Sequence, residues 1–184
     1  MANHIKTPIG ELKWSSSIKP KTDSYGSTNY EVTHLTTTEL AGKFNDQFEQ
    51  GLKAQLDVLA KEKGQQFVDS IVIKRPYHPE LDETGTPTGK WKFVAKAKHE
   101  FKGKDGKMVN NQPIRVDGDK NPLPADVEVA NGSEGLIVVE PQEWYLKFND
   151  KKLSFSFSLP MRLKVIQVTK LIQYTGKSNP LDVL

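Results

Sequence analysis

The sequence predicts a mainly β fold, a small antiparallel barrel that carries one long helix. Three observations predict it: many short segments alternate apolar and polar residues, turn-forming residues separate these segments, and one stretch alone repeats its apolar residues with a helical period. Strands and helices do not alternate along the chain. A parallel sheet built from β-α-β units is therefore not expected.

Length and composition limit the class of protein. The 184 residues correspond to about one domain, and the formal charge of +3 is only mildly basic. Cysteine is absent, which excludes disulfides, thiol catalysis and zinc-cysteine sites. No apolar run suits a membrane span or a signal peptide. We expect a cytosolic protein without membrane contact, with an extension at 1–9, a domain at 10–176 and a flexible tail at 177–184.

The first third of the chain predicts a hairpin and a helix. Residues 10–20 alternate as a half-buried strand that Pro20 ends, and residues 30–35 form a second strand beyond a polar loop. The helix, about 39–63, follows from the apolar residues at every fourth position. Thr36 to Glu39 match a capping box at its start, and Gly64 marks its end. This apolar stripe is expected to pack against a sheet.

The remaining elements are shorter. Residues 66–74 fit either a short strand or a buried connection. After a polar loop comes a strand at 90–98, which a turn at 103–106 joins into a hairpin with the apolar residues of 108–116. Asp, Gly, Asn and Pro form another turn at 117–122. Further strands are expected within the segments 136–139, 144–148, 153–159 and 161–174.

The strand at 90–98 carries two kinds of side chain on its two faces. Successive strand residues point to opposite sides, so four lysines, Lys90, Lys92, Lys96 and Lys98, share one face, interrupted by Val94. The other face holds Trp91, Phe93, Ala95 and Ala97, which we expect in the barrel interior. A row of ammonium groups suits the repeated phosphates of a polyanion. A solvated outer face is the alternative.

Several motifs are rejected as sites of chemistry. The segment 85–90 resembles a phosphate-binding loop, but it is one residue short between its glycines and leads into a strand. Asp117, Asp119, Asn121 and Glu128 have calcium-loop spacing, but Pro122 stands where glycine must turn, so a turn is predicted. The four histidines have no metal-ligand spacing. We expect neither an enzyme nor a cofactor.

Four segments, in this order and spacing, resemble a known family. They are 10–20 leading to 30–33 and the helix, then 114–123, then Asn131 to Ser133 opening a strand, and 163–174. The family is the single-stranded-DNA-binding proteins of tailed, chiefly short-tailed, bacteriophages, and the resemblance covers residues 8–176. It implies an OB-fold five-stranded antiparallel barrel with the helix inserted after the early strands. It also implies a protein that coats and protects unwound DNA during phage replication, recombination and repair in the host cytoplasm.

The resemblance also implies partners. They are single-stranded DNA and phage replication proteins such as a polymerase or helicase. A homodimer is left open, since the sequence does not give the oligomeric state. The family's acidic C-terminal tail contacts the replication proteins, whereas the residues after Tyr174 hold a single carboxylate side chain, that of Asp182. The sequence therefore does not support binding of those proteins through a tail.

A single strand can be held without sequence reading by cations that follow its phosphates and by aromatic rings that stack on its bases. Besides the four lysines above, the candidate cations are Arg75, Lys102, Arg115, Lys147, Arg162 and Lys164. The stacking candidates are Tyr25, Tyr30, Tyr77, Trp144 and Tyr145. Trp144 and Tyr145 are adjacent, so only one of them can face a ligand on a strand.

Two other functions remain open from the sequence. An RNA-binding OB module uses the same stacking and cations, since only 2′-hydroxyl contacts distinguish RNA. A non-enzymatic structural or assembly protein of a phage particle could have a similar all-β domain.

Overall fold

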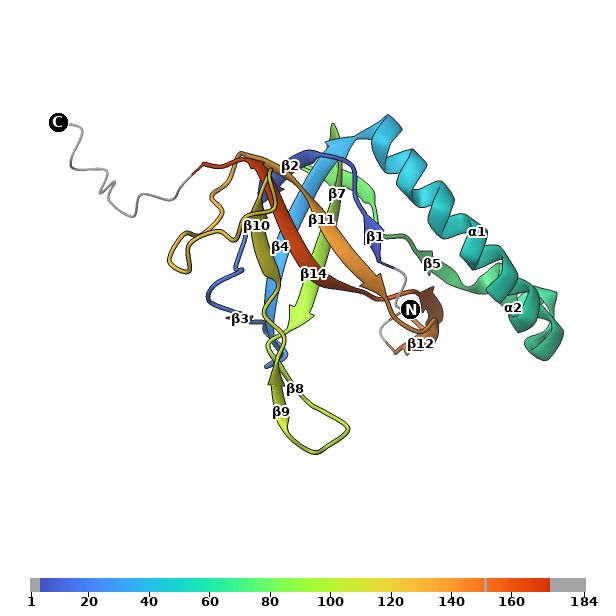
Figure 1. The fold of residues 1–184 in the computed structure, drawn as a ribbon. Helices are drawn as coiled ribbons and strands as arrows, with labels where there is room; N and C mark the ends of the chain where they lie inside the picture. The colour runs from blue at the N-terminus through green and yellow to red at the C-terminus, as the bar shows by residue number, and fades with distance from the viewer. Residues whose placement is uncertain (1–3, 151, 173–184) are drawn as a thin grey trace.

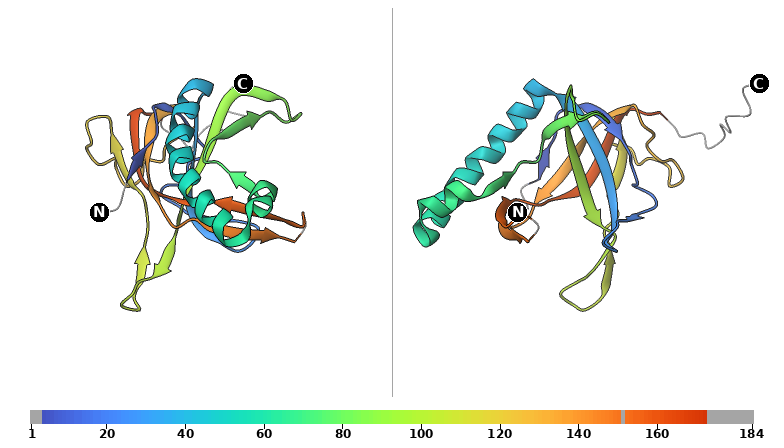
Figure 2. Two further views of the ribbon diagram at one scale, coloured as in Figure 1. Left: turned by 90° about the vertical axis from the view of Figure 1, so that its right-hand side faces the viewer. Right: turned by 180° about the vertical axis from the view of Figure 1, so that it is seen from behind.

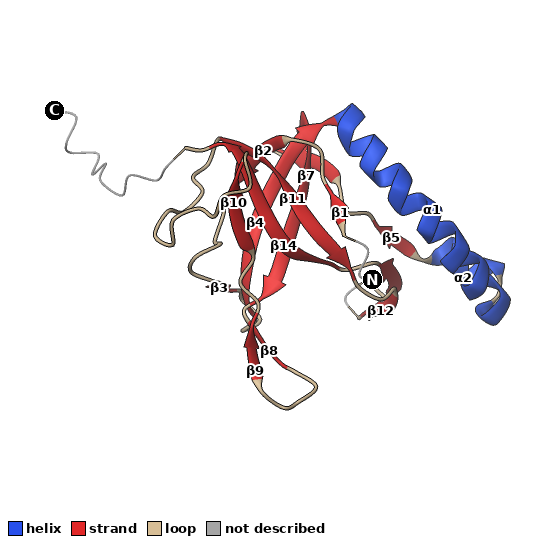
Figure 3. Cartoon of the chain, in the orientation of Figure 1, coloured by secondary structure: helices blue, strands red, loops and turns tan. Residues whose placement is uncertain are grey.

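The computed structural model describes residues 4–150 and 152–172, and strands dominate it (Figure 3). The predicted mainly β fold is confirmed. The strands are β1 (Ile5–Lys6), β2 (Gly10–Lys13), β3 (Lys21–Thr22), β4 (Thr28–Thr37), β5 (Val72–Lys74), β6 (His78–Leu81), β7 (Pro87–Lys98), β8 (Glu100–Lys102), β9 (Met108–Asn110), β10 (Ile114–Asp117), β11 (Ser133–Pro141), β12 (Tyr145–Asn149), β13 (Ser154–Ser158) and β14 (Met161–Lys170).

Five strands pair in succession around the core. β2 pairs with β4, β4 with β7, β7 with β14, β14 with β11, and β11 again with β2. Most of these pairings are antiparallel, but β7 and β14 run parallel and share a single registered pair, Lys96 with Arg162. The ring of strands is therefore not tightly closed between β7 and β14. The expectation of a purely antiparallel barrel was wrong at this pair of strands. A long stretch of chain separates β7 from β14, so no hairpin dictates their direction.

The long helix is confirmed as α1 (Thr38–Lys63). Gly64 ends the helix as predicted, and its amide donates to the Ala60 carbonyl. The residue that caps the start is Thr37, whose hydroxyl accepts a hydrogen bond from the Leu40 amide, and not Thr36 of the predicted capping box, because Thr36 is buried in β4 and Glu39 pairs with Lys43. A second helix, α2 (Gln65–Ser70), was not predicted. It occupies most of the segment 66–74, whose end forms β5, and its apolar residues Phe67 and Val68 are partly buried against a cluster that includes Leu52 of α1.

Two hydrophobic clusters hold the molecule together. The first fills the ring of strands with Leu12, Val32, Phe93, Ile137 and Leu163 among others. The second lies between the helices and the three-stranded sheet of β12, β13 and β5. Both helices lie to one side of the ring (Figures 1 and 3). The second cluster therefore fixes the small sheet beside β7 and β14.

Three peripheral features complete the fold. The β8–β9 hairpin projects from the body as an arm (Figures 1 and 2). β1, which falls within the expected extension 1–9, pairs with β11 in the main sheet. The expected tail at 177–184 lies outside the described residues. Within the part of the chain that the structure describes, neither helix combines the length and apolar character needed to cross a membrane.

Candidate nucleic-acid interface

The two faces of β7 differ as the alternation predicted. Phe93, Ala95 and Ala97 are buried in the ring, and Trp91 packs partly buried against the same core. Lys96 and Lys98 are exposed, and in the β4–β7 ladder they pair with Glu31 and Asn29. Cross-strand partners share a face. The outer surface of β4 and β7 is therefore polar and carries exposed cations near the C-terminal end of β7.

The other two lysines of the row are less available. Lys92 is partly buried in the ladder between His78 and Leu35, and it helps burial to lower the pKa of His78. The Lys90 ammonium lies 2.7 Å from Oε2 of Glu11, and this hydrogen bond raises the pKa of Lys90. Lys96 is also paired, with Glu31 at 3.2 Å, so phosphate contact is easiest at Lys98.

One hollow opens beside the middle of β7. It has a volume of about 280 Å³ and lies between β7, the residues around β5 and the β13–β14 connection. Its lining includes three cations, Lys74, Arg75 and Lys96, together with Ser158. The Arg75 guanidinium pairs with Glu49 of α1, which holds this side chain beside the hollow. The predicted cation Arg75 therefore lies close to the lysine row, although it is distant in sequence.

A second hollow opens at the end of β7. It has a volume of about 540 Å³ and is bounded by the turn before β4 and by the base of the β8–β9 arm. Tyr25, Lys98, His99, Glu100 and Met108 are among its lining residues. Tyr25 is 91% exposed, so its ring is free to stack on a base. Lys96 lines the first hollow and Lys98 the second, and the two lysines are neighbours on one strand face.

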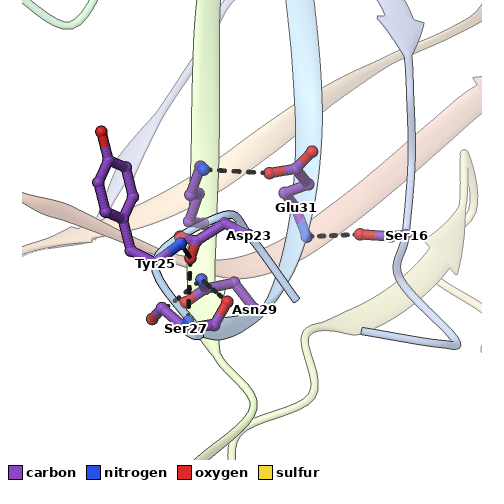
Figure 4. Close-up of polar contacts among 7 residues, drawn as sticks. Ser16, Asp23, Tyr25, Ser27, Asn29 and Glu31 are labelled. Carbon is purple, nitrogen blue, oxygen red and sulfur yellow. Dashed lines mark hydrogen bonds and ion pairs between the residues drawn. The ribbon is translucent and has the colours of Figure 1, made fainter. Parts of the chain in front are cut away.

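The turn that carries Tyr25 is tightly bonded (Figure 4). Oδ1 of Asp23 accepts hydrogen bonds from the amides of Tyr25 and Ser27, each at 2.9 Å, and the Gly26 amide donates to the Asp23 carbonyl. Gly26 has a φ of +79°, which glycine adopts without strain. Figure 4 shows the Tyr25 ring directed away from this turn. An exposed aromatic ring is thus presented on an ordered backbone.

The small sheet extends the basic surface from the first hollow. Lys74, Ser158 and Tyr145 are successive partners across β5, β13 and β12, so they share one face, and Lys147 lies on it two residues after Tyr145. Tyr145 is 44% exposed. Trp144 packs instead in the second cluster, stacked on Phe157 with centroids 5.2 Å apart. Of these two adjacent aromatics, Tyr145 is the one available to a ligand.

Three predicted contact residues are occupied elsewhere. Tyr77 is 1% exposed, with its hydroxyl 2.6 Å from Nδ1 of His34, and Tyr30 is 2% exposed, with its hydroxyl donating to Asn110. Neither ring can stack on a base, because both fill the core. Arg115 donates hydrogen bonds to the carbonyls of Pro124, Ala125 and Val127, so its guanidinium organises the chain before β11.

The last predicted cations lie on β14 and the arm. Arg162 is the registered partner of Lys96, stands 3.7 Å from the Glu140 carboxylate, and lies over the Phe101 ring at 5.5 Å. Lys164 is 4.0 Å from the same carboxylate. Lys102 is exposed on β8. Arg162 and Lys164 border the surface around Lys96, but their charge is largely balanced by Glu140.

Sequence reasoning missed Lys74 and misjudged Trp14. Lys74 directly precedes Arg75, and that pair of adjacent cations was the available signal. Trp14 was expected within an alternating strand, yet it is 61% exposed, with a φ of +51°. Such a backbone irregularity has no local sequence signature at a tryptophan.

The rejected calcium motif is indeed a turn, in which Asp117 accepts hydrogen bonds from the amides of Asp119 and Asn121.

The structure shares its fold with solved single-stranded-DNA-binding proteins of bacteriophages, which confirms the resemblance at the level of fold. Gp2.5, a single-stranded DNA-binding protein encoded by bacteriophage T7, matches with a TM-score of 0.70 at 14% identity, over 100% of this chain and 96% of that one. No protein-family model and no curated protein sequence matches the chain.

A second phage protein gives a weaker match. The single-stranded DNA-binding protein of bacteriophage Enc34 has a TM-score of 0.55 at 14% identity, over 97% of this chain and 88% of that one. The same protein in complex with single-stranded DNA has a TM-score of 0.54 at 14% identity, over 91% and 86% of the two chains. At these identities the likeness concerns the fold.

Proposed function

We propose that this protein binds single-stranded DNA, with little dependence on base sequence, along a surface that we call the candidate interface. It consists of Tyr25, Lys98, Lys96, Arg75, Lys74, Tyr145 and Lys147. The observation that carries the proposal is the position of Lys96 and Lys98 on one strand face, each lining one of two hollows. Cations in the middle and exposed tyrosines at both ends provide phosphate contact and base stacking.

The strand order supports a finer description of the fold. We propose that β2, β4, β7, β11 and β14 are the five strands of a partly open OB barrel, with α1 inserted between the second and third. OB folds bind oligonucleotides on the face of strands 2 and 3 and on the loops after strands 1 and 4. Here these correspond to β4 and β7, the segment 14–27 with Tyr25, and the segment 142–160 with Tyr145 and Lys147.

The biological role follows from the same proposal. A protein that binds a single strand without reading its sequence can cover unwound DNA and protect it, and the similar phage proteins are described as binding single-stranded DNA. We propose a non-enzymatic role in phage DNA replication, recombination and repair, in the cytoplasm of the infected host.

Removing the two exposed lysines of β7 tests the interface. In the Lys96→Ala/Lys98→Ala variant we expect weaker binding to a fluorescent single-stranded oligonucleotide. The slope of log K against log salt should become less steep by about 0.7 if Lys96 stays paired with Glu31, and by about 1.4 if both lysines contact phosphates, because each phosphate contact on a single strand contributes roughly 0.7. Titrations at several salt concentrations measure both quantities.

The matched control is Lys53→Ala/Lys61→Ala, which removes two exposed lysines from α1. Its net charge equals that of the β7 variant, so a purely long-range charge effect would weaken both proteins alike. The proposal requires the slope to change only in the β7 variant. Identical slopes in both variants would remove β7 from the interface.

A further inference from the structure

The second hollow contains a carboxylate that a general phosphate-binding surface does not need. Glu100 lines it together with Tyr25, Lys98, His99 and Met108. Among the described residues no cation lies within ion-pair distance of the Glu100 carboxylate, whereas acids beside the other β7 cations are paired, as Glu31 is with Lys96 at 3.2 Å and Glu11 with Lys90. Glu100 is therefore an exposed acceptor in a basic surface.

The backbone around Glu100 is fixed on both sides. Glu100 is registered with Asn110 in the β8–β9 hairpin, the His99 amide donates to the Thr28 carbonyl at 2.9 Å, and the Asn111 amide donates to the His99 carbonyl at 2.9 Å. Phe101 lies on the opposite face of β8, where Arg162 covers its ring. β8 thus separates Glu100, which faces the hollow, from Arg162, which lies on the opposite face of the strand.

The size and lining of the hollow suit one unpaired nucleobase. Tyr25 supplies an exposed ring for stacking, and the thioether of Met108, 62% exposed, supplies a polarisable apolar surface. Lys98 lines the same hollow, where its ammonium group can contact the phosphate next to the bound base. The Glu100 carboxylate only accepts hydrogen bonds when it is ionised, and it is the one acid in the lining, beside the polar groups of Ser27, Thr28 and His99.

We propose that this hollow is a base-selective subsite that favours bases with an exocyclic amino group, such as cytosine, over thymine. This proposal rests on the proposed function. A carboxylate accepts a hydrogen bond from the N4 amino group of cytosine. The one donor of an unpaired thymine, N3–H, lies between the two acceptors O2 and O4, and these repel a carboxylate that approaches it. A protein that tolerates most sequences would then have one position with a base preference.

Titration with oligo-dC and oligo-dT of equal length, at one salt concentration and neutral pH, tests the subsite. We expect the wild-type protein to bind oligo-dC roughly fivefold more tightly than oligo-dT, the lower end of the discrimination that a side-chain contact to a base edge provides. In Glu100→Gln the ratio should fall to about one, since an amide can accept from cytosine and donate to thymine.

Glu83→Gln is the matched control, since it removes one exposed negative charge from the turn before β7, outside both hollows. It should leave the ratio at the wild-type value while raising the affinity for both oligonucleotides slightly. Equal binding of oligo-dC and oligo-dT by the wild-type protein, or an unchanged ratio in Glu100→Gln, would overturn the subsite and leave the proposed function standing. If neither oligonucleotide binds, both proposals fail.

Discussion

His34 is a titratable side chain in the middle of the ring of strands. It is fully buried, and its Nδ1 atom shares a hydrogen bond of 2.6 Å with the Tyr77 hydroxyl, while Nε2 has no hydrogen-bond partner among the described residues. Burial lowers the pKa of His34 to about 4. Gly10 permits this packing, because a Cβ there would lie 2.7 Å from the imidazole ring. The histidine is thus neutral in the folded protein at neutral pH.

The stability of the protein should therefore fall as the pH falls from 7 to 5. The unfolded chain binds a proton on His34 near the ordinary pKa of 6.5, whereas the folded chain binds it only near 4, so the unfolded state gains protons first. We expect the free energy of unfolding to fall by about 2 kcal/mol across this interval. Urea unfolding at the two pH values measures it.

A His34→Gln variant separates this contribution from others. It should lose most of the pH dependence between pH 7 and pH 5, even if it is less stable throughout. His78, whose pKa burial also lowers, contributes in the same direction, so His78→Gln should reduce the dependence less. A pH dependence in His34→Gln as steep as in the wild type would contradict the assignment.

Residue patterns predicted burial well where a strand is regular. The alternation in β7 correctly predicted that Phe93, Ala95 and Ala97 are buried and that Lys96 and Lys98 are exposed. It could not place Tyr77, which follows a proline in an irregular segment and fills the core beside α1. A tyrosine is equally suited to a solvent-exposed edge and to a core position where its hydroxyl has a hydrogen-bond partner. Only its tertiary neighbours therefore decide whether it is buried.

At the scale of elements, the segment between β2 and β3 is held by one carboxylate. Glu128 accepts hydrogen bonds from the Ser15 hydroxyl and the Ile18 amide, both at 2.9 Å, and from the hydroxyl and amide of Ser17. Burial raises the pKa of Glu128, but these hydrogen bonds outweigh it and bring the pKa below its ordinary value. This contact attaches the start of the segment that carries Tyr25.

Glu128→Gln should destabilise the protein by about 2 kcal/mol, since hydrogen bonds to a charged acceptor are worth roughly 1.5–3 kcal/mol. The folded-state pKa is lowered, so this stabilisation is present above the ordinary pKa of a glutamate and is lost as the pH falls through the folded value. Urea unfolding at neutral pH measures the difference. Glu134→Gln, which breaks an exposed ion pair with Lys170, is the control and should cost less than about 1 kcal/mol. Equal losses would show that the Glu128 contacts do not hold the loop.

Elements with strong local signals were predictable. Apolar residues at every fourth position, with Gly64 after them, predicted the bounds of α1 to within one residue. Asp, Gly and Asn residues predicted the turns at 103–106 and 117–122. α2 was not predictable, because six residues are too few for a helical period to separate them from a buried strand. Its conformation depends on packing against α1.

At the scale of the whole molecule, the candidate interface depends on long-range pairing. Arg75 lies beside Lys96 because β5 joins the small sheet and α1 holds Arg75 through Glu49. Tyr25 meets Lys98 because β4 pairs with β7 along most of its length. The sequence contained these residues as candidates, but the two hollows arise from contacts between distant segments and have no local pattern.

Single-strand binding is tested by titrating the protein with one mixed-sequence oligonucleotide, as a single strand and as a duplex, at about 50 and 200 mM salt. We expect the single strand to bind more tightly, since its bases are open to Tyr25 and Tyr145. The slope of log K against log salt should lie between about −2 and about −3.5. The first value counts the three interface cations that form no ion pair with another described residue, and the second counts all five. No binding to single-stranded DNA at the lower salt concentration, or binding that salt does not weaken, would contradict the central claim.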